Sequence, residues 1–296
     1  MPIENVPRHK AVTRFFGNVF GPYRLAAAMA ALTLSIAPVH AADISVTGVV
    51  WQPDNDTIDI NGTWDQIGVH QLLIQWSAVD NTAFIAGANI PTAPKLPNWK
   101  RIAAQPWARQ VILGLAGRFD ENAARNNLEE LTVLSARLAK LPTPLNVVGW
   151  YFPVEIDPTW VDAKRLVPLL ATLPRPLWIS VYDSANVGPD DLAKWLATWL
   201  PDDVGVFFQD GVGVYARQAP VAVEYLNALD KRLGKRRVRV IAEAFRPKVG
   251  GGFRPATVEE LLPQLSAYEG RKIYLFDGPH YVSDAMVDDL KQLLKK

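Results

Sequence analysis

Eight short apolar runs alternate along this chain with segments that have the residue spacing of helices. Most of these runs are β-branched or aromatic and almost continuously apolar, as is typical of parallel strands covered on both sides. Strands alternating with helices form a parallel sheet, and eight pairs favour its closure into a single α/β domain, a (β/α)8 TIM barrel. The predicted strands are Ile44–Gln52, Gln71–Ser77, Gln110–Leu115, Asn146–Phe152, Leu177–Tyr182, Val204–Gln209, Val238–Ala242 and Lys272–Phe276.

The segments between these strands carry helix signals of uneven strength. Asp120 is placed as an N-cap, and Thr257 with Glu260 has the spacing of a capping box. The first two connections offer only short helical stretches, Thr63–Ile67 and Asn98–Gln105, so we expect an irregular barrel on that side. The predicted longer helices are Glu121–Leu141, Val161–Leu173, Pro189–Leu200, Pro220–Leu233, Thr257–Tyr268 and Ser283–Leu294.

The first 41 residues have the pattern of a secretory signal peptide. Basic residues precede an apolar run, Leu25–Ile36, and the small residue Ala41 closes a cleavage pattern. The run is shorter than the roughly 20 residues that cross a bilayer as a helix, so no stable membrane span is expected after cleavage. An uncleaved amino-terminal anchor is the alternative, because the basic region is long. We predict a periplasmic or secreted protein in which residues 42–296 form one barrel, close to the roughly 250 residues typical of that fold.

Charge and composition exclude several classes of function. The chain has 31 Lys and Arg residues against 30 Asp and Glu, and this balance argues against a nucleic-acid partner. It has no cysteine and 4 histidines, so it has no thiolate nucleophile, no cysteine zinc site and no histidine-rich metal site. No nucleotide-binding loop of the Walker type occurs. We therefore predict no cofactor, no metal and a neutral or weakly charged substrate.

Polar side chains follow the ends of most predicted strands. The carboxyl ends of barrel strands form the catalytic face, so we predict that these side chains contact the substrate. A single Asp at such a place is also a common helix cap or turn former. The predicted polar contacts are Gln52, Asp80, Asn81, Asp157, Asp183, Gln209, Asp210, Arg246 and His280.

Aromatic side chains lie near the same strand ends. Sugar rings present apolar C–H faces that stack on aromatic rings, so these residues are predicted sugar-binding positions. Packing in the core is the alternative, and for tryptophan it is the commoner fate. The aromatic residues in question are Trp51, Trp76, Tyr151, Tyr182, Phe245 and Tyr281.

Two glutamates, Glu155 and Glu243, stand at the ends of the fourth and seventh predicted strands. Hydrolysis of a glycosidic bond needs one protonated carboxyl and one ionised carboxylate. Glu155 follows an apolar and aromatic run, which disfavours its charged form and predicts the acid. Glu243 has Arg246 nearby to keep it ionised, which predicts the nucleophile. The alternative for both is a structural carboxylate or a buried salt bridge.

Several blocks of the sequence resemble a known group of proteins. A fourth-strand acid and a seventh-strand nucleophile are the arrangement of the retaining barrel glycosidases. The blocks are also similar to those of a bacterial family of unknown function grouped with these enzymes. One departure is that Val154 precedes Glu155, where many enzymes of the broader clan have Asn; Asp157 and Asp210 are the alternative acids. The blocks are Trp51–Pro53, Leu73–Trp76 with Asp80–Phe84, Gly149–Asp157, Gln209–Gly213 and Ala242–Phe245.

These observations together predict an exported glycoside hydrolase that cleaves a polysaccharide or exopolysaccharide, with a retaining and endo-acting mechanism. Its partner is then a polysaccharide or oligosaccharide substrate. A non-catalytic carbohydrate-binding barrel in a polysaccharide export or assembly complex is the alternative from another class. A transglycosylase shares the covalent intermediate with a retaining hydrolase, so the residues alone do not separate the two.

Overall fold

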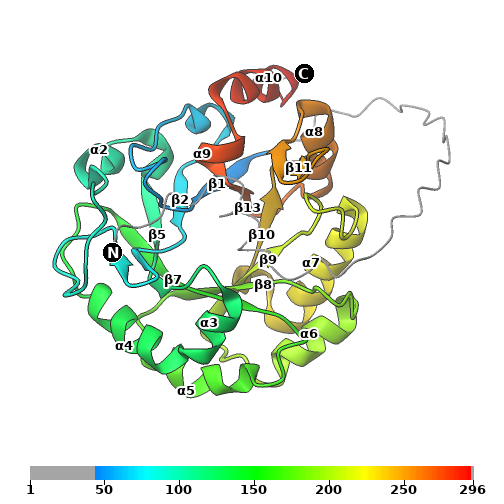
Figure 1. Cartoon of the computed structure of the whole chain (residues 1–296). Helices are drawn as coiled ribbons and strands as arrows, with labels where there is room; N and C mark the ends of the chain where they lie inside the picture. Colours follow the sequence, from blue (N-terminus) through cyan, green and yellow to red (C-terminus); the bar gives the residue numbers. More distant parts are fainter. Residues whose placement is uncertain (1–43, 295–296) are drawn as a thin grey trace.

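The computed structural model describes residues 44–294, whose eight central strands form a closed parallel barrel (Figure 1). Every neighbouring pair in this barrel is parallel. The eight predicted strands and the (β/α)8 TIM barrel are confirmed, and the predicted signal peptide lies outside the described residues. The barrel strands are β1 (Val46–Trp51), β2 (Gln71–Ile74), β5 (Gln110–Gly114), β7 (Val147–Ile156), β8 (Leu177–Val181), β9 (Val204–Gln209), β10 (Val238–Glu243) and β13 (Ile273–Phe276).

The outer layer consists of helices that follow the predicted segments (Figure 1). The N-cap at Asp120 and the capping box of Thr257 with Glu260 are confirmed. The predicted helix Glu121–Leu141 is instead two helices, because Asn127 leaves the helical conformation and its amide donates to the carbonyl of Ala123. The helices are α3 (Glu121–Asn126), α4 (Leu128–Leu138), α5 (Leu166–Leu170), α6 (Pro189–Ala197), α7 (Ala219–Leu233), α8 (Val258–Ala267) and α10 (Asp284–Leu294).

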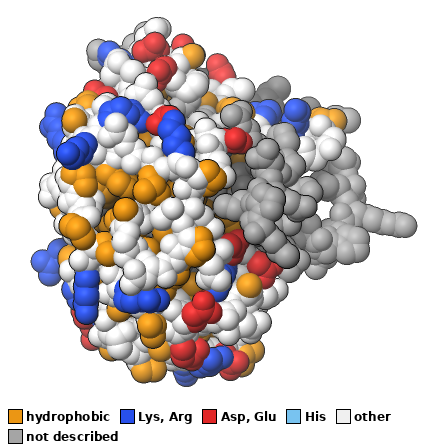
Figure 2. Space-filling view, turned by 60° about the vertical axis from the view of Figure 1, so that its left-hand side comes forward, with side chains coloured by type: hydrophobic (Ala, Val, Ile, Leu, Met, Phe, Trp, Pro, Cys, Tyr) orange, Lys and Arg blue, Asp and Glu red, His pale blue; other side chains and the backbone are white. Residues whose placement is uncertain are grey.

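The first two connections are irregular, as predicted. Only the 3-10 helix η1 (Trp64–Ile67) links β1 to β2. The next connection contains the hairpin of β3 (Ala78–Val79) and β4 (Thr82–Ala83), followed by α2 (Trp99–Ala103) and η2 (Pro106–Ala108). β3 also pairs with β6 (Ala116–Gly117), which follows β5. Indole rings complete the outer layer here, since Trp64 packs edge-on against Trp107 with centroids 5.1 Å apart. Toward the side of α2 and α4, hydrophobic side chains form a band between lysines and arginines (Figure 2).

Strand direction gives the barrel a carboxyl-end mouth and an amino-end mouth. Large side chains fill the interior at the amino-end mouth. The guanidinium of Arg239 lies 3.7 Å from the ring centroid of Trp178 and donates to the Tyr274 hydroxyl at 2.8 Å. Gly205 makes room for this layer, because a Cβ there would lie 2.2 Å from the Trp178 ring. Among residues 44–294, no helix is both long and apolar enough to cross a bilayer.

Candidate active site

Glu155 and Glu243 stand at the same mouth of the barrel. Glu155 is the second-last residue of β7 and Glu243 the last residue of β10, and both strands run in the same direction around the closed sheet. Both side chains are buried, Glu155 at 6% exposure and Glu243 at 0%. Burial raises the pKa of the Tyr182 hydroxyl most, and the negative charges of Glu243 and Glu155 raise it further. The carboxyl-end mouth therefore holds two buried carboxyls, and the charges of both raise the pKa of the same residue, Tyr182.

Glu155 is held by its strand neighbours and by α3. Its Oε2 accepts a hydrogen bond from Gln209 Nε2 at 2.6 Å. Its backbone N–H donates to Glu121 Oε2 at 3.1 Å, and Arg125 donates to its carbonyl at 3.0 Å. Burial, and then the negative charge of Glu121, raise the pKa of Glu155 well above its usual value. A carboxyl in this setting keeps a proton at neutral pH, as a general acid must.

Glu121 is a third carboxyl of this mouth that the sequence reading missed. It is the first residue of α3, and burial raises its pKa to about 7, with the Arg125 charge opposing. In sequence it follows the N-cap Asp120, where an acidic residue is expected because it favours the positive end of the helix dipole. Only the packing of α3 on β7 distinguishes it from an ordinary first-turn carboxylate.

Glu243 is held by the loop that follows β9. Its Oε2 accepts from the backbone N–H of Val214 at 3.2 Å and from that of Gly213. A Cβ at Gly213 would lie 2.5 Å from the Cβ of Glu243, so only glycine fits this approach. The other oxygen, Oε1, is buried with no hydrogen-bond partner among the described residues. Burial, and then the charge of Asp210, raise the pKa of Glu243 to about 8, while the two amides and Arg217 lower it.

Arg246 does not have the expected role of keeping Glu243 ionised. Its guanidinium donates to the backbone carbonyls of Glu243, Phe245 and Glu260 and to the side chain of Gln264. The cation that acts on the Glu243 carboxyl is the buried Arg217, which donates to the carbonyls of Asp183 and Asp210. Because Arg246 binds carbonyls and Arg217 opposes burial only in part, Glu243 carries a raised pKa instead of the expected ordinary one.

Asp210 is a fully buried carboxylate whose oxygens are both occupied by the protein. Its Oδ1 accepts from the backbone N–H of Val212 and of Glu243, and its Oδ2 from Gln264 and the Tyr268 hydroxyl. These bonds join the end of β9 to the end of β10 and to α8. Asp210 therefore positions Glu243 instead of meeting a sugar or replacing Glu155 as the acid.

Asp157 and Asp183 likewise hold loops. Asp157 accepts from Thr159 at 2.8 Å and from the Ser184 N–H at 2.9 Å. Asp183 accepts from the backbone N–H groups of residues 187 and 188 and from the Tyr225 hydroxyl. Because their oxygens already accept hydrogen bonds from the protein, both aspartates have the structural role in caps and turns that was the alternative prediction. Asp157 is therefore not a substitute for Glu155 as the acid.

Asp80 and Asn81 form the turn of the β3–β4 hairpin. Both have positive φ, 46° and 61°, which is the backbone of a type I′ turn that Asp and Asn tolerate. Asp80 Oδ1 also accepts from the Phe119 N–H at 3.3 Å. Their sequence signal is explained by turn geometry.

The predicted stacking aromatics are buried. Trp51 is 0% exposed and donates to Thr57, while Trp76 is 1% exposed and donates to the carbonyl of Pro53. Both are core residues, so a stacking role for them is a wrong prediction. The remaining predicted aromatics are also buried and are Tyr151, Tyr182, Phe245 and Tyr281.

A cluster of opposite charges lies next to β13. His280 Nδ1 is 2.7 Å from Asp277 Oδ2, and its Nε2 is 3.3 Å from Asp54 Oδ2. Burial alone would lower the pKa of His280, but the two carboxylates raise it to about 10, so the ring is an imidazolium at neutral pH. The backbone N–H of Gln52 also donates to Asp277, whose Oδ1 is buried without a partner among the described residues. The His280 ring and the backbone N–H of Gln52 thus bind the same carboxylate oxygen, Asp277 Oδ2.

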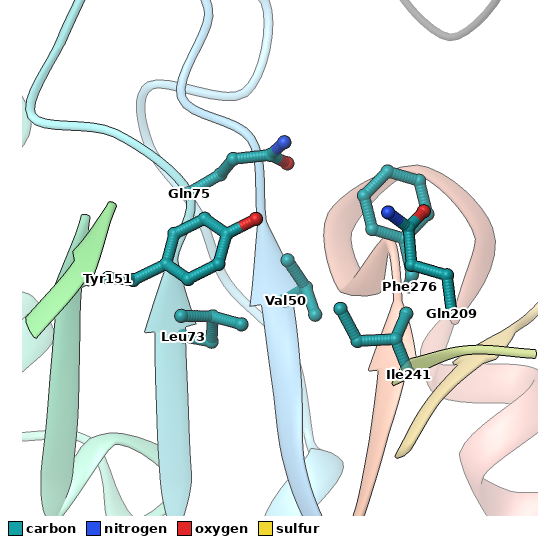
Figure 3. Close-up of a pocket in the computed structure, with 7 residues that line it drawn as sticks. All are labelled: Val50, Leu73, Gln75, Tyr151, Gln209, Ile241 and Phe276. Carbon is teal, nitrogen blue, oxygen red and sulfur yellow. The ribbon is translucent and has the colours of Figure 1, made fainter. Parts of the chain in front are cut away.

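A small cavity lies in the middle of this mouth. Figure 3 shows Gln75 and Tyr151 on one side, Gln209 with Phe276 on the other, and apolar side chains below. Its volume is about 10 Å³, which is room for one water molecule. Both amide atoms of Gln75 are buried and without partners among residues 44–294. Gln75 is therefore a residue of this mouth, although the sequence indicated it only as part of the block Leu73–Trp76. In this conformation no sugar ring fits the cavity.

Tyr215 is an exposed aromatic beside the mouth that the sequence reading missed. It is 64% exposed and has a φ of 60°, one residue after Val214, whose N–H binds Glu243. A bulky residue in this backbone region is uncommon and often marks a functional position. The Glu260 hydrogen bond and, less strongly, Tyr215 raise the pKa of Arg254, so the Tyr215 hydroxyl lies near the hairpin of β11 (Phe245–Pro247) and β12 (Phe253–Pro255).

Carboxylates and histidines of this mouth do not form a metal centre. Within residues 44–294, no group of three or more His, Cys, Asp or Glu side chains could hold a metal ion.

The sequence is similar to a family of domains and to a known protein. The family described as "Domain of unknown function (DUF4434)" matches residues 57–286. "Uncharacterized protein YbcH" of Escherichia coli (strain K12) is 26% identical over 228 residues, which cover 66% of this chain and 75% of that protein.

Two solved structures share the fold. A candidate alpha-L-fucosidase from Bacteroides thetaiotaomicron has a TM-score of 0.58 and 15% identity, covering 88% of this chain and 99% of that one. The PgaB (BpsB) glycoside hydrolase domain from Bordetella bronchiseptica has a TM-score of 0.51 and 12% identity, covering 84% and 99%. The barrel therefore resembles those of glycoside hydrolases.

Proposed function

We propose that this chain, which belongs to the DUF4434 family of domains of unknown function, is an exported glycoside hydrolase that cleaves a polysaccharide. Glu155 is the general acid and Glu243 the nucleophile of a retaining mechanism. The observation that carries the proposal is the pair of buried carboxyls with raised pKa at one barrel mouth, both acting on Tyr182. Buried carboxyls with strongly perturbed pKa values are characteristic of catalytic sites.

The two carboxyls have different parts in the proposed reaction. Glu155 keeps its proton because of burial and the Glu121 charge, and it gives that proton to the glycosidic oxygen as the bond to the anomeric carbon breaks. Glu243, once ionised, forms a bond from its carboxylate oxygen to that carbon, giving a covalent glycosyl ester. Water then attacks the same carbon and loses a proton to Glu155, which releases the sugar and restores both groups.

The backbone amides of Gly213 and Val214 orient Glu243 for this attack. They bind Oε2 and leave Oε1, the oxygen without a partner among the described residues, as the atom that meets the sugar. Hydrogen bonds to a carboxylate favour its charged form, so the amides oppose the effect of burial. Asp210 fixes the position of the same strand end through the Glu243 N–H at 3.3 Å.

Substrate entry requires the mouth to open. The cavity of about 10 Å³ is far below the roughly 300 to 1,000 Å³ usual for ligand pockets, and we propose that the loop after β9 and the β11–β12 hairpin move apart when a sugar binds. Gly250, Gly251 and Gly252 at the hairpin tip all have positive φ, which gives this segment a glycine-rich turn. Tyr215, exposed between these two segments, is the proposed first contact for an incoming sugar ring.

The sequence supports export, and the likeness to solved structures supports a carbohydrate substrate. Residues 1–41 have the basic region, apolar run and small-residue end of a signal peptide. An exported hydrolase meets glycans outside the cytoplasm, and the two solved structures named above are described as a fucosidase and a glycoside hydrolase domain.

The test is hydrolysis of a panel of bacterial exopolysaccharides by the purified protein, with products followed by mass spectrometry. We expect new reducing ends from one polymer, and the initial product with the same anomeric configuration as the substrate by proton NMR. Inversion would reject the retaining mechanism. Binding of a polymer without any product would identify a non-catalytic carbohydrate-binding barrel, and products joined to added acceptor sugars would identify a transglycosylase.

A further inference from the structure

A second concave site lies at the amino-end mouth, on the side of the barrel opposite the glutamates. It is a cavity of about 400 Å³ between α7, the start of β10 and the turn before β13. Five cationic side chains line it, and Asp230 is its one carboxylate. The cationic residues are Lys235, Arg236, Arg239, Arg271 and Lys272.

The positive charge of this cavity is not compensated by the protein. Asp230 is taken by Arg271, whose Nη1 donates to it at 2.8 Å. Within residues 44–294, the ion pairs leave the other four cations without a carboxylate partner. Four like charges around one cavity repel one another unless an anion lies between them. The arrangement is therefore one that an anionic ligand would stabilise.

Inside the barrel, the positive charge of Arg239 also has no carboxylate partner among the described residues. Its Nη1 donates to Tyr274, but its Nε is buried without a hydrogen-bond partner among the described residues. Burial lowers the pKa of Arg239, and burial together with the Arg239 charge lowers the pKa of Lys272. The Arg239 charge inside the barrel therefore adds to the positive potential at this mouth, where Lys272 stands beside it.

The shape of the cavity indicates a small ligand. Its volume lies in the range of about 300 to 1,000 Å³ that is usual for small-molecule pockets. Its floor is apolar, formed by Leu226, Val238 and Val240. A flat basic stripe would suit a long polyanion, whereas a closed floor with a cationic rim suits an organic body that carries a phosphate.

We propose that this cavity binds a small organic phosphate, with the phosphate held by Lys235, Arg236 and Lys272 and the organic part on the apolar floor. In sequence the site corresponds to the basic run 231–239, KRLGKRRVR, which the overall charge balance conceals. The inference does not rest on hydrolase activity, because the cavity and the two glutamates occupy opposite mouths of the barrel.

Titration calorimetry of the purified protein with pyrophosphate and with glucose 1-phosphate tests the proposal. We expect saturable 1:1 binding, with glucose 1-phosphate bound and glucose not bound. The double variant Arg236→Ala with Lys272→Ala removes two exposed rim cations, and we expect Kd to rise about tenfold or more, since charge-assisted bonds are lost. A rise in Tm on adding pyrophosphate gives a second readout that this variant loses.

A matched control separates a built site from general attraction by charge. Lys100→Ala with Lys140→Ala removes two exposed cations elsewhere and changes the net charge equally. Kd within about twofold of wild type is expected for this control, because distant surface charges are screened at physiological salt. Equal weakening in both double variants overturns the proposal, as does the lack of saturable binding of either phosphate. Binding only to long polyanions such as heparin also overturns it.

Discussion

At the carboxyl-end mouth of the barrel several buried carboxyls lie near the buried cations Arg217 and Arg246, whereas at the amino-end mouth the buried charge is the guanidinium of Arg239. Glu155 and Glu243 have neighbouring carboxyls, Glu121 and Asp210, whose charges raise their pKa values. Arg239 lies against the Trp178 ring and is hydrogen-bonded to Tyr274, whose hydroxyl in turn donates to Gln71. One mouth thus brings neighbouring carboxyls together, and the other places its cation among aromatic and amide groups.

This difference separates function from stability in one fold. Like charges buried side by side oppose folding, so they persist where they serve a reaction. The aromatic and amide layer at the other mouth closes the barrel, and the cavity with uncompensated cations lies outside it. Substitutions at the two mouths should therefore affect activity and unfolding in opposite ways, which the following predictions test in decreasing order of effect.

Glu243→Gln and Glu155→Gln should produce the largest effect, a loss of hydrolysis by about 10³-fold or more, because each removes a group that exchanges a bond or proton in the reaction. The measurement is kcat/KM on the polymer identified above. Glu259→Gln, an exposed glutamate on α8, is the matched control and should keep wild-type activity. Wild-type activity in the double Glu155/Glu243 variant would reject the assignment.

The pH dependence of stability should differ between wild type and Glu243→Gln. The pKa of Glu243 is about 8 in the folded chain and has an ordinary value of 4.5, so its stabilising effect is complete below pH 4.5 and is lost as pH rises through 8. Gln has no such dependence. We expect the Tm of the variant minus that of wild type to increase by on the order of 5 °C from about pH 5 to pH 9. A constant difference would contradict a buried, protonated Glu243.

Tyr274→Phe should weaken the amino-end mouth without changing catalysis. It leaves Arg239 and Gln71 without the hydroxyl that joins them, at a cost of about 1 to 3 kcal/mol in the free energy of unfolding. Urea unfolding measures this loss, and kcat/KM per folded molecule should stay at the wild-type value. A fall in activity at full folding would show that the two mouths are not separate.

Tyr215→Ala should have the smallest effect, a rise in KM of about five- to tenfold with kcat little changed, since a stacking platform contributes roughly 1 kcal/mol. Tyr215→Phe keeps the ring and should keep the wild-type KM. Tyr215→Gly also removes the ring, but it should raise the free energy of unfolding relative to Tyr215→Ala, because glycine tolerates the φ of 60°. Equal KM values for the Ala and Phe variants would exclude stacking.

Residues of the mouth differed in how far sequence could assign them. Glu155 and Glu243 were found because each ends a hydrophobic strand, and strand ends are local features. Asp80 and Asn81 gave the same kind of signal, but they form a hairpin turn. Gln209 contacts Glu155 across 54 positions of sequence, and Glu121 reaches Glu155 from a helix. Contacts of this kind are set by packing, so no local pattern reports them.

The sequence alone determined the order of strands and helices and hence the closed barrel, because apolar periodicity and capping residues act over a few neighbours. Tertiary structure decided which polar side chains keep an atom without a hydrogen-bond partner among the described residues. Asp157, Asp183 and Asp210 are occupied by loop amides and neighbouring side chains, whereas Glu243 retains an oxygen without a partner among the described residues. The physical reason is that burial and hydrogen bonding depend on segments far apart in the chain, and these set the charge state of each carboxyl.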